Sequence, residues 1–217
     1  MERDLEGKVA LITGATGGMG QATAIALAKR GVKVVIAARR EAEGAQTVQM
    51  LRDTGSDGLF IKTDVTKEDE ARQMVDKTVE AFGRLDFAFN NAGSGVNKPI
   101  TELSLDEWNY DVEVNLTGVF LGVKAQLPAM AAAGGGAIVN MSSQTATYAS
   151  PGYGAYAAAK SGVEAFSRVA AIEGAKMNGK RQYCRTRRDQ HRHSEDRAAK
   201  TARNAEIADS AGASRRD

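Results

Sequence analysis

Short apolar runs alternate with longer segments of helical composition through residues 9–173. The apolar runs cover 9–12, 32–38, 59–63, 87–89 and 137–141, and the helical segments cover 22–29, 40–54, 67–82, 105–129 and a last stretch that ends near Glu173. Runs of this length are typical of strands buried on both faces of a parallel sheet. Because right-handed crossovers place helices on both faces of such a sheet, we predict one doubly wound α/β domain over residues 1–175.

A glycine-rich turn follows the first apolar run. It reads Thr13-Gly14-Ala15-Thr16-Gly17-Gly18-Met19-Gly20 and leads into the first predicted helix. Glycines allow a tight turn that brings the main chain close to a pyrophosphate, and the start of a helix offers free N–H groups to phosphate. Such turns also occur without ligands. With a strand before it and a helix after it, this turn favours dinucleotide binding at the carboxyl edge of a Rossmann-type sheet.

The last predicted helix carries Tyr156 and Lys160, four residues apart. Residues at this spacing share one face of a helix, so a phenol and an ammonium group can meet in one small site. A neighbouring cation favours the phenolate form of tyrosine, and such a phenol can exchange protons with a substrate near neutral pH. Tyrosine and lysine at this spacing are also common in helices that have no catalytic role.

Several separate motifs follow one another along the chain. They are Thr13-Gly14-x-x-x-Gly18-x-Gly20, Asp64-Val65, Asn90-Asn91-Ala92-Gly93, Asn115, Ser143 and Tyr156-x-x-x-Lys160. In this combination the chain resembles the short-chain dehydrogenase/reductase family over about residues 5–175. The resemblance implies an oxidoreductase that moves a hydride between a nicotinamide cofactor and a carbonyl or secondary alcohol substrate.

The resemblance also implies a catalytic set. Tyr156 would be the general acid/base, and Lys160 would favour its phenolate and hold the nicotinamide ribose. Ser143, rather than Ser142, stands at the family's distance before the tyrosine and would hydrogen-bond the substrate oxygen where charge develops. Asn115 would hold a water in a proton relay to the lysine. Taken alone, Ser143 would more often cap a turn, and Asn115 would be a plain buried amide.

Cofactor contacts follow from the same resemblance. The main chain of residues 90–93 would lie beside the adenosine ribose, and Asp64 would accept a hydrogen bond from the adenine amino group, although an aspartate there is equally typical of a helix N-cap. No metal site is expected. The full predicted cofactor set is Thr13, Gly14, Thr16, Gly18, Met19, Gly20, Arg39, Arg40, Asp64, Val65, Asn91, Ala92, Gly93, Tyr156 and Lys160.

The end of the second predicted strand bears on the choice between NAD and NADP. An acidic residue there would bind the ribose 2′-hydroxyl of NAD and repel a 2′-phosphate. This chain has Ala38 instead, followed by Arg39 and Arg40. Guanidinium groups suit a phosphate, so NADP is the preferred cofactor and NAD the alternative. The two arginines could also be solvated loop residues.

Composition bears on compartment and partners. The charged start, the single Cys184 and the lack of a long apolar stretch suit a cytoplasmic protein without a secretory signal, a disulfide framework or a membrane partner. The expected partner is a small carbonyl or alcohol substrate, with Tyr153 lining its pocket. Family members often associate through helices that match 105–129 and 155–173, so a homo-oligomer through these helices is possible.

Residues 176–217 differ from the rest of the chain. They hold 12 Lys and Arg against 6 Asp and Glu, and periodic apolar residues nearly vanish. Family members continue here into a sixth strand and a Pro-Gly turn, whereas residues 178–188 predict no buried strand. One interpretation is a disordered basic tail. A nucleic-acid-binding tail is disfavoured because acidic residues interrupt it and Tyr183 is its one aromatic residue.

A shift of reading frame is the second interpretation of this region. If the codons for residues 181–195 are read one nucleotide further on, permitted choices include Val-Asn-Thr-Val-Ala-Pro-Gly-Ala-Ile-Asn-Thr-Asp-Ile-Leu. This string contains the missing strand and turn in register. We therefore predict a frame displaced near Lys180. If the tail is what the cell makes, the chain would be a dinucleotide-binding protein with impaired catalysis, because the cover of the nicotinamide would be lost.

Overall fold

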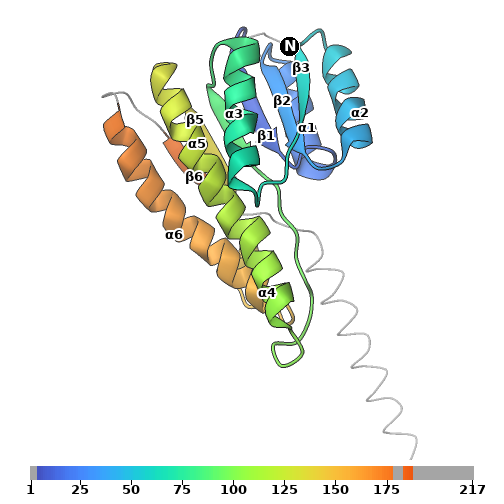
Figure 1. Cartoon of the computed structure of the whole chain (residues 1–217), viewed down its shortest axis with the longest axis vertical. Coiled ribbons are helices and arrows are strands. Elements are labelled where there is room, and N and C mark those ends of the chain that lie inside the picture. The colour runs from blue at the N-terminus through green and yellow to red at the C-terminus, as the bar shows by residue number, and fades with distance from the viewer. Residues whose placement is uncertain (1–3, 178–182, 188–217) are drawn as a thin grey trace, which may run out of the picture.

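The computed structural model describes residues 4–177 and 183–187, and within them the chain forms one parallel sheet between two layers of helices (Figure 1). The strand order is β3-β2-β1-β4-β5-β6, and every neighbouring pair is parallel. The strands are β1 (Val9–Thr13), β2 (Lys33–Ala38), β3 (Gly58–Lys62), β4 (Phe87–Asn90), β5 (Ala137–Met141) and β6 (Tyr183–Arg187). The predicted doubly wound α/β architecture is confirmed.

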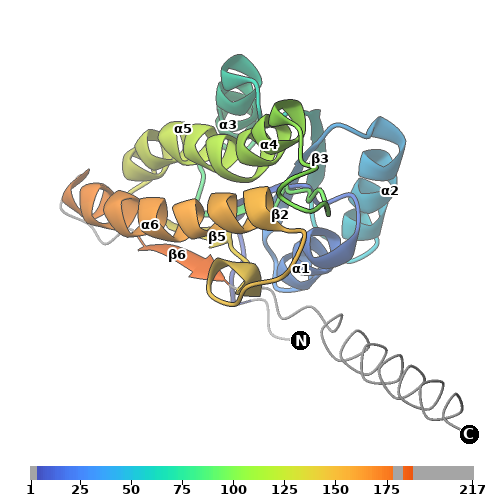
Figure 2. The ribbon, with the colours of Figure 1, turned by 90° about the horizontal axis from the view of Figure 1, so that it is seen from below.

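Two hydrophobic clusters divide the helices between the faces of the sheet (Figure 2). One face is covered by α1 (Gly18–Ala28) and α2 (Glu41–Arg52), and the other by α3 (Glu68–Phe82), α5 (Gly118–Ala132) and α6 (Gly154–Lys176). Successive residues of β1 serve opposite faces: Ala10 and Ile12 pack toward α1, whereas Leu11 packs toward α5. This alternation is the reason that the predicted strands are apolar throughout.

The helix predicted near 105–129 forms as three consecutive segments. They are α4 (Leu105–Val112), a π-helical turn η1 (Glu113–Thr117) and α5. A capping box starts α4, in which Ser104 Oγ accepts from the Glu107 N–H and the Glu107 carboxylate accepts from the Ser104 N–H. A π-turn displaces the regular pattern of main-chain hydrogen bonds and is frequent at functional sites. Here it contains Asn115.

A buried carboxylate ties β1 to β4 at the amino edge of the sheet. Asp86 accepts hydrogen bonds from Lys8 Nζ at 3.0 Å, from the Val9 N–H at 3.0 Å and from Arg84 Nε at 2.7 Å. Burial raises the pKa of Asp86, but these hydrogen bonds outweigh it, so the pKa lies below its ordinary value. This end of the sheet is therefore fixed by charge, opposite the edge where the motifs gather.

The sequence did not predict β6. Residues 178–188 lack the apolar pattern of a buried strand, yet residues 183–187 pair with β5 over the register from Ala137↔Tyr183 to Met141↔Arg187, and the prediction is corrected there. An edge strand is held by main-chain hydrogen bonds, which any side chain permits, and the crossover through α6 returns the chain beside β5. Predictions about residues 178–182 and 188–217 lie outside the described residues.

No helix in the described part of the chain combines the length and the apolar character needed to cross a membrane.

Candidate active site

The glycine-rich turn after β1 is packed directly against the end of β4. Gly14 has a φ of +66°, and its N–H donates to the Ala37 carbonyl at 2.9 Å. A Cβ atom on Gly14 would lie 2.8 Å from Ala92 Cα, which is closer than side chains approach main chain. Only glycine fits both the positive φ and this approach. The predicted turn and the predicted Asn91–Gly93 segment are thus brought together.

Thr13 and Asn91 lock the two segments through main-chain groups. Thr13 Oγ1 accepts from the N–H groups of Asn91 and Ala92, both at 3.0 Å. In return, Asn91 Nδ2 donates to the carbonyls of Thr13 at 3.1 Å and Gly14 at 3.2 Å. Gly20 lies against the Asn91 side chain, since a Cβ on Gly20 would lie 2.6 Å from Asn91 Nδ2. Thr13 and Gly20 therefore shape the turn from behind, which is a different role from contact with a ligand.

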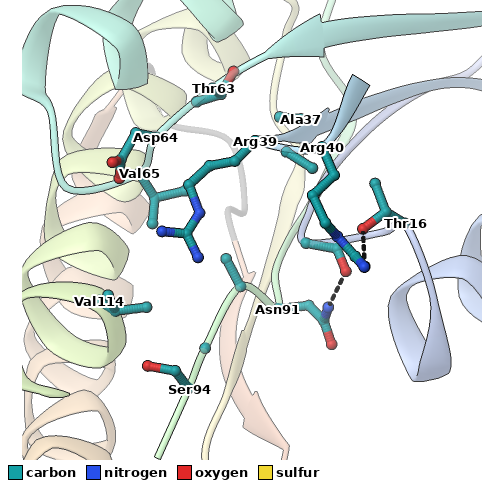
Figure 3. Close-up of a pocket in the computed structure, with 14 residues that line it drawn as sticks. Thr16, Ala37, Arg39, Arg40, Thr63, Asp64, Val65, Asn91, Ser94 and Val114 are labelled. Carbon is teal, nitrogen blue, oxygen red and sulfur yellow. Dashed lines mark hydrogen bonds between the residues drawn. The ribbon is translucent and has the colours of Figure 1, made fainter. Parts of the chain in front are cut away.

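A pocket of about 260 Å³ opens between this turn and the ends of β2, β3 and β4 (Figure 3). Nine of the residues predicted to bind the cofactor line it: Gly14, Thr16, Arg39, Arg40, Asp64, Val65, Asn91, Ala92 and Gly93. Thr13, Gly18, Met19 and Gly20 are not among its lining residues, although Gly18 adopts the positive φ of +55° and begins α1.

The two arginines after β2 differ in their engagement. Arg40 Nη2 donates to Thr16 Oγ1 at 2.8 Å, and Arg40 Nη1 pairs with Glu43 Oε1 at 3.0 Å. Arg39 extends its guanidinium into the pocket beside Val65 (Figure 3) and forms no hydrogen bond or ion pair with any described residue. A cation held over the pocket without a partner is available to an anionic ligand.

Of the two roles weighed for Asp64, the structure excludes the helix N-cap, and the contact with adenine stays a prediction. Asp64 lines the pocket, and its Oδ1 accepts from the Thr66 N–H at 3.0 Å and Thr66 Oγ1 at 2.9 Å. Its own N–H donates to Glu70 Oε2 at 2.7 Å. The helix N-cap itself is Lys67. The carboxylate therefore stabilises the turn before α3 while facing the pocket.

Tyr156 and Lys160 lie together on α6. Lys160 is 1% exposed, and its Nζ lies 5.5 Å from the centre of the Tyr156 ring and donates to the Met141 carbonyl at 2.9 Å. The ring of Tyr153 approaches that of Tyr156 edge-on, with centroids 6.1 Å apart. An ammonium group buried this deeply stays charged only where acceptors and anions surround it. The predicted pair thus shares one enclosed site.

Asn115 joins the loop after β4 to the π-turn. Asn115 Nδ2 donates to the Ser94 carbonyl at 2.7 Å and to the Asp111 carbonyl at 2.9 Å, and its Oδ1 accepts from the Ser94 N–H at 3.3 Å. A Cβ on Gly93 would lie 2.8 Å from Asn115 Oδ1 and 3.5 Å from Lys160 Nζ. Gly93 therefore lies between two predicted catalytic residues and leaves them room to approach each other.

The two serines after β5 point to different partners. Ser142 is fully buried and its hydroxyl donates to Glu164 Oε1 at 2.9 Å. Ser143 Oγ accepts from the Thr145 N–H at 3.3 Å and caps the short 3-10 helix η2 (Gln144–Ala146). The capping role weighed for Ser143 is present, and because Ser143 Oγ accepts in this hydrogen bond, the turn does not use its hydroxyl proton.

Sequence reasoning missed three residues at this edge. The Ser94 hydroxyl is buried beside the pocket and has no hydrogen-bond partner among the described residues. Gly95 faces the Tyr156 ring, from which an added Cβ would lie 3.4 Å away, and Asp111 is a fully buried acid one helical turn before Asn115. The spacing Asp111-x-x-x-Asn115 was visible in the sequence, but only the fold shows that both side chains turn inward.

A dinucleotide fits these features. Gly14 lines the pocket as bare main chain with no room for a Cβ beside Ala92, Arg39 has no partner among the described residues, and neither has the Ser94 hydroxyl. The phosphates and ribose hydroxyls of a dinucleotide would supply partners for these groups. In the described residues, no cluster of three or more His, Cys, Asp or Glu side chains is arranged to hold a metal ion.

Comparison with known proteins places this chain among dehydrogenases. Residues 8–180 match the family model described as short chain dehydrogenase. The chain is 44% identical over 172 residues to the short chain dehydrogenase/reductase astE of Aspergillus oryzae, covering 78% of this chain and 66% of that protein. It is also 44% identical over 167 residues to cis-4-hydroxycyclohexanecarboxylate dehydrogenase of Sinomonas cyclohexanicum, covering 76% of this chain and 66% of that protein.

Solved structures agree with this. A short chain dehydrogenase from Mycobacterium smegmatis superposes with a TM-score of 0.82 at 34% identity, covering 86% of this chain and 78% of that one. NAD+-bound xylitol dehydrogenase superposes with a TM-score of 0.80 at 31% identity, covering 83% of this chain and 69% of that one. The chain spans about two thirds of the length of curated relatives such as the Aspergillus protein, with 66% of its length covered.

Proposed function

This chain belongs to the short-chain dehydrogenase family, and from that premise we propose that it is an NAD(P)-dependent oxidoreductase acting on a secondary alcohol or the corresponding carbonyl compound. The observation that carries the proposal is the pair of half-buried Tyr156 and buried Lys160, with Asn115 nearby and a pocket lined by the glycine-rich turn at the same sheet edge. The nicotinamide cofactor, when bound, supplies the hydride chemistry.

Proton transfer is the part of the reaction assigned to this chain's own residues. We assign the phenol of Tyr156 as the group that takes the proton from an alcohol or gives it to a carbonyl. Lys160, 5.5 Å from the ring centre, favours the phenolate through its charge. Ser143 would donate its hydroxyl proton to the substrate oxygen as negative charge develops there. Asn115 would hold the water of a relay toward Lys160.

The test of this function compares two tyrosine variants. Tyr156→Phe should bind NADPH as tightly as the wild type but lose turnover by about a hundredfold or more, since it removes only the acid/base group. The matched control is Tyr148→Phe, the same change at a side chain that is 68% exposed. Relatives include enzymes named for cyclic substrates, so cyclohexanols are the first substrates to screen. Full turnover in Tyr156→Phe would refute the assignment.

NADP is the cofactor we propose in preference to NAD. The support is the unpartnered Arg39 guanidinium in the pocket and the lack of an acid at the end of β2. A charge-assisted hydrogen bond contributes about 1.5–3 kcal/mol, so Arg39→Asp should weaken NADPH about 10–100-fold and leave NADH nearly unchanged. The control is Arg52→Asp, the same charge change at an exposed position of α2. Equal weakening of both cofactors by Arg39→Asp would overturn the preference.

A second candidate function is dinucleotide binding without efficient catalysis. It is favoured because the match to the family model ends at residue 180, near the proposed frame change at Lys180. NADPH binding by fluorescence titration without turnover on any alcohol would support it. Resequencing the gene across this codon tests the frame directly: an intact frame that encodes the tail without the alternative strand would refute the frame change and leave the second candidate function standing.

Self-association is a further part of the proposal. Leu105, Trp108 and Phe120 on the α4–α5 side and Val169 and Ile172 on α6 are each between 39% and 72% exposed. Apolar side chains gathered on adjacent helices favour burial against a second copy. Light scattering after size-exclusion chromatography should therefore give a multiple of 23.0 kDa. A monomer at micromolar concentration would refute association through helices 105–129 and 155–173.

A further inference from the structure

Two acidic side chains, Asp86 and Asp111, are buried in the described part of the chain. Asp86 is paired with Lys8 and Arg84 at the amino edge of the sheet. Asp111 is 0% exposed and lies at the opposite edge, on α4, within one turn of Asn115. A buried carboxylate is costly unless hydrogen bonds or opposite charges compensate it. Its partners therefore indicate what the fold uses it for.

The Asp111 carboxylate holds the main chain of the loop after β4. The Val96 N–H donates to both of its oxygens, at 3.1 Å and 3.3 Å. Burial raises the pKa of Asp111, opposed by this hydrogen bond and by the positive charge of Lys160. The carboxylate is thus linked to the loop by geometry and to the lysine of the site by charge.

Asp111 and Asn115 act on alternate residues of the same loop. Asn115 binds both main-chain groups of Ser94, and Asp111 binds the N–H of Val96. Residues four apart on a helix lie on one face, and residues two apart in an extended segment point the same way. One helical turn therefore clamps the loop at two points on either side of Gly95.

Gly95, between the two points, faces the ring of the acid/base residue. A Cβ on Gly95 would lie 3.4 Å from Tyr156 Cδ2 and 3.7 Å from Tyr153 Cε1, so the space between the Gly95 Cα and these rings is no wider than a methyl group. If the loop loosened, the ring of Tyr156 would lose the neighbour that limits its movement on this side. A displacement of about 1 Å in a catalytic group can reduce a rate about a hundredfold.

We propose that Asp111 is a positioning residue: by holding the Val96 N–H, it fixes the Ser94–Val96 loop and through Gly95 the ring of Tyr156. The inference rests on the proposed function of Tyr156 as acid/base. It gives the buried carboxylate a role that acts through the loop and requires no contact with substrate or cofactor.

Two substitutions of Asp111 distinguish the effect of its hydrogen-bond acceptor from the effect of its side-chain volume. Asp111→Asn keeps an oxygen that can accept from the Val96 N–H, whereas Asp111→Leu keeps the volume without an acceptor. Glu113→Gln, an acid-to-amide change at an exposed neighbour, is the control. We would measure kcat and KM for NADPH-dependent turnover of a cyclohexanone, NADPH affinity, thermal unfolding, and amide hydrogen exchange of the peptide that spans residues 94–97.

In Asp111→Leu we expect kcat to fall about tenfold or more with NADPH affinity within about twofold of wild type, since Asp111 does not line the cofactor pocket and Asn115 still holds Ser94, which does. Amide exchange of residues 94–97 should accelerate in the same variant. Asp111→Asn should restore most of kcat and the slow exchange, and Glu113→Gln should match the wild type. This pattern supports positioning.

Other patterns overturn the proposal. Wild-type kcat and exchange in Asp111→Leu would show that the loop needs no clamp, and a parallel fall of melting temperature and NADPH affinity would show a general structural role. Failure of Asp111→Asn to restore either quantity would refute the hydrogen-bond acceptor as the cause. If wild-type protein turns over no substrate, the proposed function fails separately, and the exchange measurement still decides whether Asp111 clamps the loop.

Discussion

Replacing Gly20 by alanine should damage the protein far more than the same change three residues earlier. Gly20 lies in the first turn of α1, where alanine would ordinarily stabilise the helix by about 1 kcal/mol. An added Cβ would lie 2.6 Å from Asn91 Nδ2 and 2.9 Å from both Ala15 Cα and the Gly14 carbonyl oxygen. Two of these three contacts are main chain, so the new methyl group cannot be accommodated by a side-chain rotation alone.

The expected cost follows from what must move. If Asn91 turns away, its two hydrogen bonds to the Thr13 and Gly14 carbonyls are lost, at about 1 kcal/mol each. Overpacking against the main chain adds about 2 kcal/mol. After the gain in helix propensity, Gly20→Ala should lower the free energy of unfolding by about 3 kcal/mol, which corresponds to about 6–12 °C in melting temperature for a domain of this size.

Gly17→Ala is the matched control in the same turn. Gly17 has an extended φ of 172°, which any residue adopts, and its added Cβ would have nothing within 4 Å. We expect its unfolding free energy to stay within about 0.5 kcal/mol of wild type. Thermal unfolding followed by circular dichroism measures both variants, and NADPH titration should show affinity lost about tenfold or more in Gly20→Ala only. Equal melting temperatures and equal NADPH affinities would refute the argument.

Two further substitutions test the amino edge of the sheet and the pocket. Asp86→Asn should lower the free energy of unfolding by about 2 kcal/mol near neutral pH, because its cationic partners are partly solvent-screened. The pKa of Asp86 is lower in the folded chain than in the unfolded chain, so this difference should hold above about pH 4 and shrink as pH falls through the folded pKa. Urea denaturation across pH 2–8 would measure the difference. A difference that stays unchanged down to pH 2 would contradict the argument. Ser94→Ala should leave the unfolding free energy within about 0.5 kcal/mol of wild type, because the Ser94 hydroxyl has no partner in the described chain. The same substitution should weaken NADPH binding several-fold in a fluorescence titration. Unchanged NADPH affinity would show that Ser94 is not part of the cofactor site.

The sheet and its order of elements could be predicted because burial on both faces leaves a simple signal. Residues 9–12 are all apolar and residues 137–141 are apolar except for Asn140, and both became strands packed between helices. The turn at Gly14 was predictable for a different reason, since glycine spacing reflects a positive φ and a close approach to main chain. The apolar runs and the glycine spacing can both be recognised from the residue types at fixed positions.

Residues that act through the main chain left weaker signals. Asp111 binds an N–H that any residue at position 96 other than proline would offer, so the residue type at that position does not mark the contact. The π-turn around Asn115 is likewise a matter of hydrogen-bond register, which apolar periodicity over 105–129 cannot reveal. Such contacts become visible only once the loop after β4 and the helix after it are placed side by side.

The division of the site across the sheet bears on which function survives in this chain. The pocket is built by the ends of β1 to β4, and Tyr156 and Lys160 lie on the helix after β5, all before residue 180, where the family match ends. Contacts within this part, such as Thr13 with Asn91 and Asp111 with Val96, need nothing from β6. Binding at the pocket and the placement of Lys160 beside the Tyr156 ring should therefore persist even where turnover is lost. Every hydrogen bond described for the turn and the loop joins residues before Lys176. If the chain bound neither NADPH nor NADH, these contacts would have to depend on residues beyond Lys176, and that result would contradict the argument.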